Sequence, residues 1–270
     1  MNPYLDIMRP KHWVKNLLVF VPLILSGLIS VNFLSLFLVF LSVCFVSSAG
    51  YILNDIYNVE EDKRNHKTRP LATGAINNKQ TVAFLAFGLL FTSMILSPIV
   101  SVLFILDFFY TIIARKYKYI DIITIAVKYP IRLLIGYIII GIAPNIFLLS
   151  ITFCFAGVLA VMKRKGEYLS GMVKKKKDYT IENLDKIFTA VGLVYVTTLY
   201  IFIAEITQTW IFIPWTLSIT NAIAITRYYS DIKDYRDSKS LAILKDKWFF
   251  ASSLIIIGVI ICMTYAYVTW

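Results

Sequence analysis

Acidic and amide side chains gather where an apolar run ends, in residues 50–74, GYILNDIYNVEEDKRNHKTRPLATG. If the helix that enters this stretch continues for two more turns, its 3.6-residue period puts Asn54, Asn58 and Asp62 on one face, with Asp55 beside them. Such oxygen ligands suit a hard cation such as Mg²⁺, which proteins bind through one or two carboxylates and the phosphates of a substrate. We call these four residues the acidic cluster, and they predict a site for a magnesium-bound diphosphate that takes part in transfer chemistry.

Charged residues also interrupt segments that are otherwise apolar. Lys128 and Arg132 stand four apart in the run 119–142, and Asp107 stands in the run 99–114. A charge inside a membrane span costs about 2.5–3.5 kcal/mol on insertion scales, so such residues are usually functional or paired. Two interpretations stay open: Asp107 and Lys128 form a buried ion pair that only fixes packing, or the helix is a cationic wall on which Arg132 forks onto phosphate oxygens.

Further candidates lie at the ends of apolar runs. Lys163 and Arg164 follow the run 145–162 and act either as topology signals or as a phosphate clamp. The loop 226–247 contains Asp231 and Asp234, which are either a second metal site or solvated acids. The histidines, His12 and His66, lie far apart with no partner for a catalytic triad, so we interpret both as ordinary interfacial residues.

The composition indicates a membrane protein. The chain has 270 residues, of which 59% are hydrophobic and 16% are charged, against about 25% charged in soluble domains. Its net charge of +11 is typical of loops that face anionic lipid, and without a nucleic-acid motif we exclude nucleic acid as a partner. The three cysteines lie in apolar runs without metal-type spacing, so we expect neither disulfides nor zinc.

We expect a single all-α domain over residues 1–270, with about nine transmembrane helices. Residues 1–16 combine cations with Trp13 and predict a helix at the membrane interface, followed by a retained span and not by a cleaved signal peptide. Because several runs are shorter than the roughly 20 residues of an upright span, the number could be eight. The predicted spans are 17–31, 33–53, 79–96, 99–114, 119–142, 145–162, 185–203, 209–226 and 248–269.

The distribution of basic residues predicts the orientation of these spans. Except for Lys128 and Arg132, every Lys and Arg lies in the N-terminal segment or in the loops 54–79, 115–118, 163–186 and 227–247. The turns on the other side contain none. The positive-inside rule then puts the N-terminus and all the candidate chemistry on the cytoplasmic side of a cell membrane.

Several motifs together resemble a known family. NDIYNVEEDKR followed by TRPLATG resembles the first aspartate-rich motif of the UbiA superfamily of intramembrane prenyltransferases. The opening RPKHWVKN is similar to the RPxQWxKN start of its decaprenyl-phosphate phosphoribosyltransferase branch, and VMKRKGEYL is similar to that branch's GKRxAEL segment. The spacing from Asp121 to Arg132 matches its fifth-helix pattern, and ITRYY with LAILKDKWF resembles its later motifs. Asn58 and Lys128 depart from the pattern, which has Asp and a small residue there.

The resemblance implies helices around a central cavity and transfer of 5-phosphoribosyl from phosphoribosyl diphosphate to a polyprenyl phosphate. It implies Mg²⁺ on Asp55, Asn58 and Asp62, with Asp55, Asp62 and Arg132 as the catalytic set. The implied substrate-binding residues are Lys15, Asn54, Arg64, Arg69, Asp121, Lys128, Lys163, Arg164, Arg227 and Tyr228. Two alternatives stay open: a prenyltransferase that joins a prenyl diphosphate to an aromatic or other acceptor, and a non-catalytic lipid-phosphate transporter, which would leave the acidic cluster unexplained.

Overall fold

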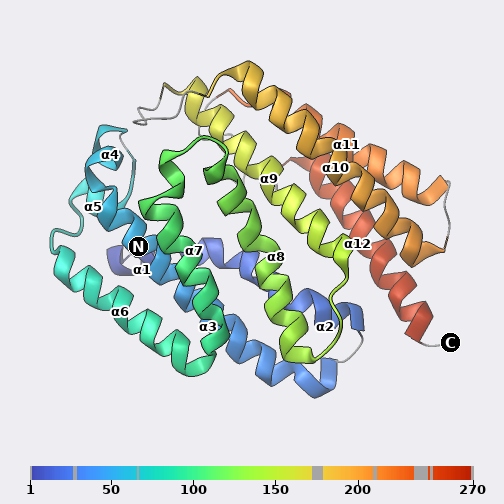
Figure 1. The fold of residues 1–270 in the computed structure, drawn as a ribbon, viewed down its shortest axis with the longest axis horizontal. Helices are drawn as coiled ribbons and strands as arrows, with labels where there is room; N and C mark the ends of the chain where they lie inside the picture. The colour runs from blue at the N-terminus through green and yellow to red at the C-terminus, as the bar shows by residue number, and fades with distance from the viewer. Residues whose placement is uncertain are drawn as a thin grey trace.

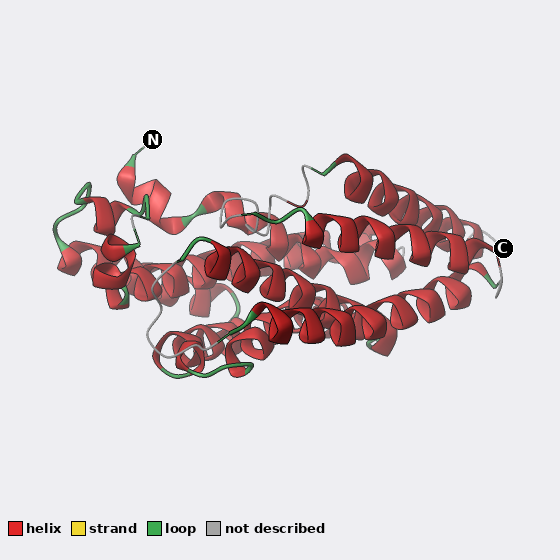
Figure 2. Cartoon of the chain, turned by 90° about the horizontal axis from the view of Figure 1, so that it is seen from above, coloured by secondary structure: helices red, strands yellow, loops and turns green. Residues whose placement is uncertain are grey.

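The computed structural model describes residues 2–26, 29–65, 67–171, 179–208, 212–233, 243 and 246–268. Within these ranges the chain forms helices and their connections, without strands (Figure 2). The elements are α1 (Pro3–Met8), η1 (Pro10–Phe20), α2 (Val21–Ser26), α3 (Ile29–Tyr57), α4 (Val59–Arg64), α5 (Pro70–Thr73), α6 (Lys79–Leu96), η2 (Pro98–Val100), α7 (Ser101–Ile112), η3 (Ala114–Lys116), α8 (Ile120–Ile140), α9 (Ile146–Leu169), α10 (Ile181–Thr207), α11 (Phe212–Ser230) and α12 (Lys247–Val268).

The protein is a multi-pass membrane protein. In the part of the chain that the structure describes, six segments are long and apolar enough to cross a bilayer, and a shorter apolar helix lies at Lys247–Val259. Large apolar side chains cover their outer surfaces; on α6, Phe84 is 77% exposed and Phe87 is 67% exposed, as expected for faces that lie against lipid. The predicted count of nine spans is not confirmed and stays a prediction.

Helix α3 is longer than the hydrocarbon core of a bilayer and carries Asn54 and Asp55 of the acidic cluster near its C-terminal end. Its 29 residues extend for roughly 44 Å at 1.5 Å per residue, more than the roughly 30 Å of hydrocarbon core. Helical hydrogen bonding continues past its end, from the Asn58 amide to the Asn54 carbonyl (3.2 Å) and from the Asp62 amide to the Asn58 carbonyl (2.8 Å). Helix α4 therefore prolongs α3 after a break at Asn58, much as the 3.6-residue spacing predicts.

Close packing fixes the N-terminal segment against α8. A Cβ atom on Gly136 would lie 2.3 Å from the carbonyl oxygen of Val19, so only glycine lets α8 approach η1 this closely. The predicted interfacial helix 1–16 is divided in the structure: α1 ends at Met8, and η1 begins at Pro10 and continues to Phe20. Since α8 contributes Ile122 to one apolar core and Ile135 to another, it joins the two halves of the bundle.

Polar segments from distant parts of the sequence meet at one end of the bundle. Figure 1 shows α4 and α5 there, beside the connection from α7 to α8 and the C-terminal end of α9. Arg69, directly before α5, has an extended backbone (φ −92°, ψ 141°), because the following proline disfavours helical geometry at that position. This turn directs Arg69 back toward the acidic cluster.

Candidate functional site

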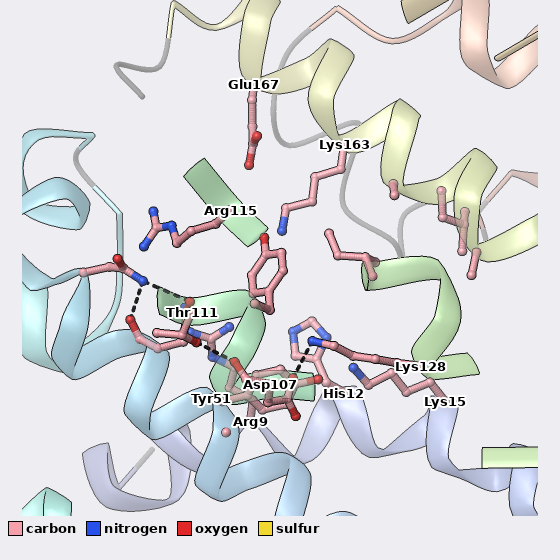
Figure 3. Close-up of a pocket in the computed structure, with 18 of the residues that line it drawn as sticks. Arg9, His12, Lys15, Tyr51, Asp107, Thr111, Arg115, Lys128, Lys163 and Glu167 are labelled. Carbon is pink, nitrogen blue, oxygen red and sulfur yellow. Dashed lines mark hydrogen bonds and ion pairs between the residues drawn. The ribbon is translucent and has the colours of Figure 1, made fainter. Parts of the chain in front are cut away.

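A cavity opens between η1, α3, α4, α7, α8 and α9, and polar and charged side chains from these elements face it (Figure 3). One wall is built by the acidic cluster, of which Asn54, Asn58 and Asp62 line the cavity. Asp55 is buried next to that wall, with 2% of its surface exposed. The end of α3 and the start of α4 therefore bring together the four residues that the sequence singled out.

Arg69 joins the two carboxylates of this wall. Its Nη1 atom lies 2.7 Å from Oδ1 of Asp55 and also contacts Oδ2 of Asp62. Arg9 contacts Asp55 as well, and Nζ of Lys67 lies 3.0 Å from Oδ1 of Asp62. Three cations thus surround two buried carboxylates, and these ion pairs offset the cost of burying the charges.

The acidic cluster is chemically suited to a hard cation. Oδ2 of Asp55 is buried without a hydrogen-bond partner, and the side-chain amide of Asn58 donates to Asn54, both to its carbonyl oxygen (2.6 Å) and to its Oδ1 (2.9 Å). Among the described residues no three His, Cys, Asp or Glu side chains converge as a metal site. A set of two carboxylates and amide oxygens matches Mg²⁺, whose remaining positions are filled by water and phosphate.

Lys128 and Asp107 form an ion pair on the opposite wall. Nζ of Lys128 lies 2.5 Å from Oδ1 of Asp107, and both residues line the cavity. Asp107 is seated against α3 at Gly50, where a Cβ atom would lie 2.7 Å from its Oδ2. The pair that the sequence suggested is therefore present, and it forms part of the cavity surface.

Arg132, which we expected to bind phosphate, does not line the cavity. It is buried. Its Nε donates to Oδ1 of Asn16 at 2.8 Å, its Nη1 donates to the carbonyl oxygen of Lys128, and its Nη2 donates to Oγ of Ser47 at 3.4 Å. The guanidinium of Arg132 thus connects η1 and α3 to α8 by hydrogen bonds, and these three elements line the cavity.

The C-terminal part of α9 supplies a cationic wall. Lys163 and Arg164 both line the cavity. Lys163 forms no ion pair with a described residue, and its side chain extends into the cavity (Figure 3). Nε of Arg164 lies 2.5 Å from Oδ2 of Asp121, and its terminal nitrogens contact Glu167 and the Tyr110 hydroxyl. Asp121, which lies outside the lining, thus holds Arg164 and does not face a ligand itself.

Three predicted substrate-binding residues lie away from the cavity. Arg64 is exposed and donates to the carbonyl oxygen of Glu60. Arg227 is paired with Asp231 and Asp246, and neither Arg227 nor Tyr228 lines the cavity. Asp231, one half of the suggested second metal site, is exposed. Its suggested partner Asp234 falls outside the described residues.

The 3₁₀ conformation of η1 creates a cavity wall of which the sequence interpretation predicted only Lys15. Residues three apart eclipse one another in a helix of three residues per turn, so His12 and Lys15 face the cavity together, and Arg9, the residue before η1, lines it as well. Lys15, a predicted phosphate ligand, lies with Nζ 4.9 Å from the centre of the Tyr51 ring. Burial, together with the charges of Lys15, Arg9, Lys163 and Arg69, lowers the pKa of His12 from 6.5 to about 4.

Comparison with known proteins finds one family model and several relatives by sequence. The model of the UbiA prenyltransferase family matches residues 17–254. The chain is 28% identical to the decaprenyl-phosphate phosphoribosyltransferase of Corynebacterium glutamicum over 60% of this chain and 53% of that protein. It is 32% identical to the digeranylgeranylglyceryl phosphate synthase of Metallosphaera sedula over 37% of this chain and 35% of that protein.

A solved structure shares the whole fold. The UbiA homologue from Archaeoglobus fulgidus bound to DMAPP and Mg²⁺ superposes with a TM-score of 0.69 at 16% identity, over 97% of this chain and 99% of that one. The matches by sequence cover less than this structural match. The chain spans about a third to a half of the length of the curated relatives that it matches.

Proposed function

The chain belongs to the UbiA prenyltransferase family, and on this premise we propose that it transfers 5-phosphoribosyl from phosphoribosyl diphosphate to a polyprenyl phosphate. One bond breaks, between C1 of the ribose and the diphosphate oxygen, and the diphosphate leaves with the electron pair. One bond forms, between C1 and an oxygen of the lipid phosphate. The finding that carries the proposal is the pairing of one acidic wall with a separate cationic wall.

The two walls match the two ends of this donor. The diphosphate is a metal-binding group and belongs at the acidic cluster, whereas the 5-phosphate needs a cation at a distance from it. Lys163, which forms no ion pair with a described residue, and Arg164 supply that cation on α9. A prenyl diphosphate carries no second phosphate group at its far end, and would leave this wall without a ligand.

The chain's own residues account for the rest of the reaction. Asp55, Asn58 and Asp62 would hold Mg²⁺, which supplies positive charge to the departing diphosphate. Arg69 and Lys67, placed by Asp55 and Asp62, add charge on the same side. Departure gives the ribose oxocarbenium character, as in other glycosyl transfers. The lipid phosphate is already ionised and needs no strong base, and Lys15 and Lys128 on the facing wall are its proposed ligands.

The acceptor and the donor would reach the cavity from different phases. The apolar outer surface of the helices is suited to a bilayer, in which a polyprenyl phosphate is dissolved. Phosphoribosyl diphosphate is soluble in water and would enter from the side on which the basic loops lie. By the positive-inside rule this is the cytoplasmic side of a cell membrane, with the N-terminus on the same side.

A two-donor assay tests the proposal. Purified protein is given labelled phosphoribosyl diphosphate with polyprenyl phosphate, and separately labelled prenyl diphosphate with aromatic acceptors, each with and without Mg²⁺. The proposal predicts that label enters lipid from the ribose donor only, and only with Mg²⁺. Magnesium-dependent transfer from the prenyl donor alone would overturn it.

Prenyl transfer is the second candidate function. It is favoured by the similarity to digeranylgeranylglyceryl phosphate synthases, and the acidic cluster would serve a prenyl diphosphate in the same way. Absence of transfer from both donors by folded protein would favour the third alternative, a non-catalytic carrier of lipid phosphate.

A further inference from the structure

His12 faces the cavity with an imidazole that no described residue engages by a hydrogen bond. It lies on η1 and lines the cavity with Lys15 and Lys163 (Figure 3). Its ring packs against Tyr51 of α3, with 5.8 Å between ring centroids and 55° between planes. The ring is therefore positioned by an aromatic contact while both nitrogens stay available. Such a half-buried histidine, without a carboxylate or carbonyl to set its tautomer, is suited to a ligand.

The charged groups around His12 are mostly cations. Lys15 and Arg9 lie on its own segment, Lys163 faces it from α9 and Arg69 from the turn before α5. The other titratable groups that line the cavity come from α3, α4, α7, η3, α8, α9 and the segment before α5. They are Tyr51, Asp62, Lys67, Asp107, Tyr110, Arg115, Lys128, Tyr129, Arg164 and Glu167. Burial, and after it the charges of these cations, lowers the pKa of His12 to about 4, so the imidazole is neutral at pH 7.

A phosphate group reverses that field. Its two or more negative charges, brought to the same cavity, offset the repulsion by the nearby cations and favour the imidazolium. The protonated ring has two N–H donors, and donors to phosphate oxygens form short, charge-assisted hydrogen bonds. The neutral ring has only one.

We propose that His12 is a ligand of a substrate phosphate, and that entry of this anion places a proton from solvent on its imidazole. The inference rests on the proposed function, in which a diphosphate donor and a phosphate acceptor both enter this cavity. His12 is not needed as a general base, because the acceptor phosphate has no proton that must be removed. The proton stays on the ring while the anion is bound and returns to solvent when the anion leaves.

The titration of the ring itself tests the inference. The chain has two histidines, so protein labelled with ¹³C in the imidazoles gives two ring signals, and His12→Gln identifies one by its loss. Glutamine stands at this position in the motif that the opening resembles, which favours folding of the variant. Should it fail to fold, His66→Gln removes the other signal. The probe is inorganic diphosphate with Mg²⁺.

Without the anion, the His12 signal is expected to titrate well below pH 6.5. With saturating diphosphate its pKa rises, by about one for each tenfold preference of the anion for the protonated form. Affinity for diphosphate then increases as the pH falls from 7.5 to 5.5, more steeply in the wild type than in His12→Gln. The comparison with His12→Gln removes the contribution of protons that the diphosphate itself binds.

An unchanged pKa with diphosphate bound would overturn the inference, as would equal pH dependence of binding in the two proteins. Ribosyl transfer by the same preparation tests the proposed function separately. Transfer with an unchanged ring pKa overturns the role of His12 alone, whereas a raised pKa without transfer from the ribose donor overturns the proposed function alone. Failure of diphosphate to bind overturns both.

Discussion

Oδ2 of Asp121 lies 2.5 Å from Nε of Arg164, and both side chains are buried. The other oxygen of Asp121 accepts a hydrogen bond from the Tyr179 hydroxyl at 2.6 Å. The aspartate at the start of α8 is thus fixed on one side and holds a cation of the cavity wall on the other. Asp121, which the sequence suggested as a substrate ligand, lies outside the cavity lining and contacts Arg164, which lines it.

The substitution Asp121→Asn should therefore weaken donor binding more than it slows the chemical step. Loss of the charge leaves Arg164 without one of its two carboxylates, so the guanidinium no longer has a single position. We expect KM for phosphoribosyl diphosphate to rise by about tenfold, which corresponds to roughly 1.4 kcal/mol, with kcat changed less. Steady-state kinetics separate the two parameters. A fall in kcat at constant KM would contradict this role.

The acidic cluster should be needed for turnover and not for insertion. Replacement of Asp55 or Asp62 by alanine removes a carboxylate from the proposed magnesium site, and we expect transfer to fall by about 10² or more, as when charge stabilisation is lost in other enzymes. Glu60 offers a matched control in the same segment, because it is exposed and its carboxylate forms an ion pair with the exposed Lys63. Glu60→Ala should keep transfer within about twofold. Near-normal rates in Asp62→Ala would refute the site.

Lys163 should contribute to affinity for the 5-phosphate. A charge-assisted hydrogen bond contributes about 1.5–3 kcal/mol, so Lys163→Met is expected to raise KM for the donor by about 10- to 100-fold. Affinity for inorganic diphosphate should change less, since the acidic cluster binds that group. Lys186, an exposed lysine paired with Glu182, provides the control Lys186→Met. Equal losses for both ligands would show that Lys163 does not distinguish the two ends of the donor.

Acid should destabilise the protein through His12. In the folded chain the pKa of His12 is about 4 instead of 6.5, so the unfolded chain binds the proton first as the pH falls. Stability is unaffected above pH 6.5 and decreases from there toward pH 4. Thermal unfolding at pH 7.5 and pH 5 should show a larger decrease in the wild type than in His12→Gln. Equal decreases would contradict the lowered pKa.

Local spacing predicted much of the fold and of the acidic wall. Apolar run lengths located the six described segments that are long and apolar enough to cross a bilayer, and the 3.6-residue period placed Asn54, Asn58 and Asp62 together. Of the wall at η1 only Lys15 was predicted, because the three-residue spacing of His12 and Lys15 indicates a shared face only when the segment is a 3₁₀ helix. The structural role of Arg132 could not be predicted from spacing. Its side-chain acceptors, Asn16 and Ser47, are 116 and 85 residues away in sequence, and local spacing contains no information on such distant partners.

The most direct test of the account is whether the acidic cluster holds a metal that is bound to diphosphate. Mn²⁺ can replace Mg²⁺, and pulsed electron paramagnetic resonance then detects ³¹P nuclei of diphosphate coordinated to the protein-bound ion. We predict ³¹P coupling in the wild type and in Glu60→Ala, and loss of the bound ion in the double variant Asp55→Ala, Asp62→Ala. Equal binding of Mn²⁺ and diphosphate by the folded double variant would contradict the account.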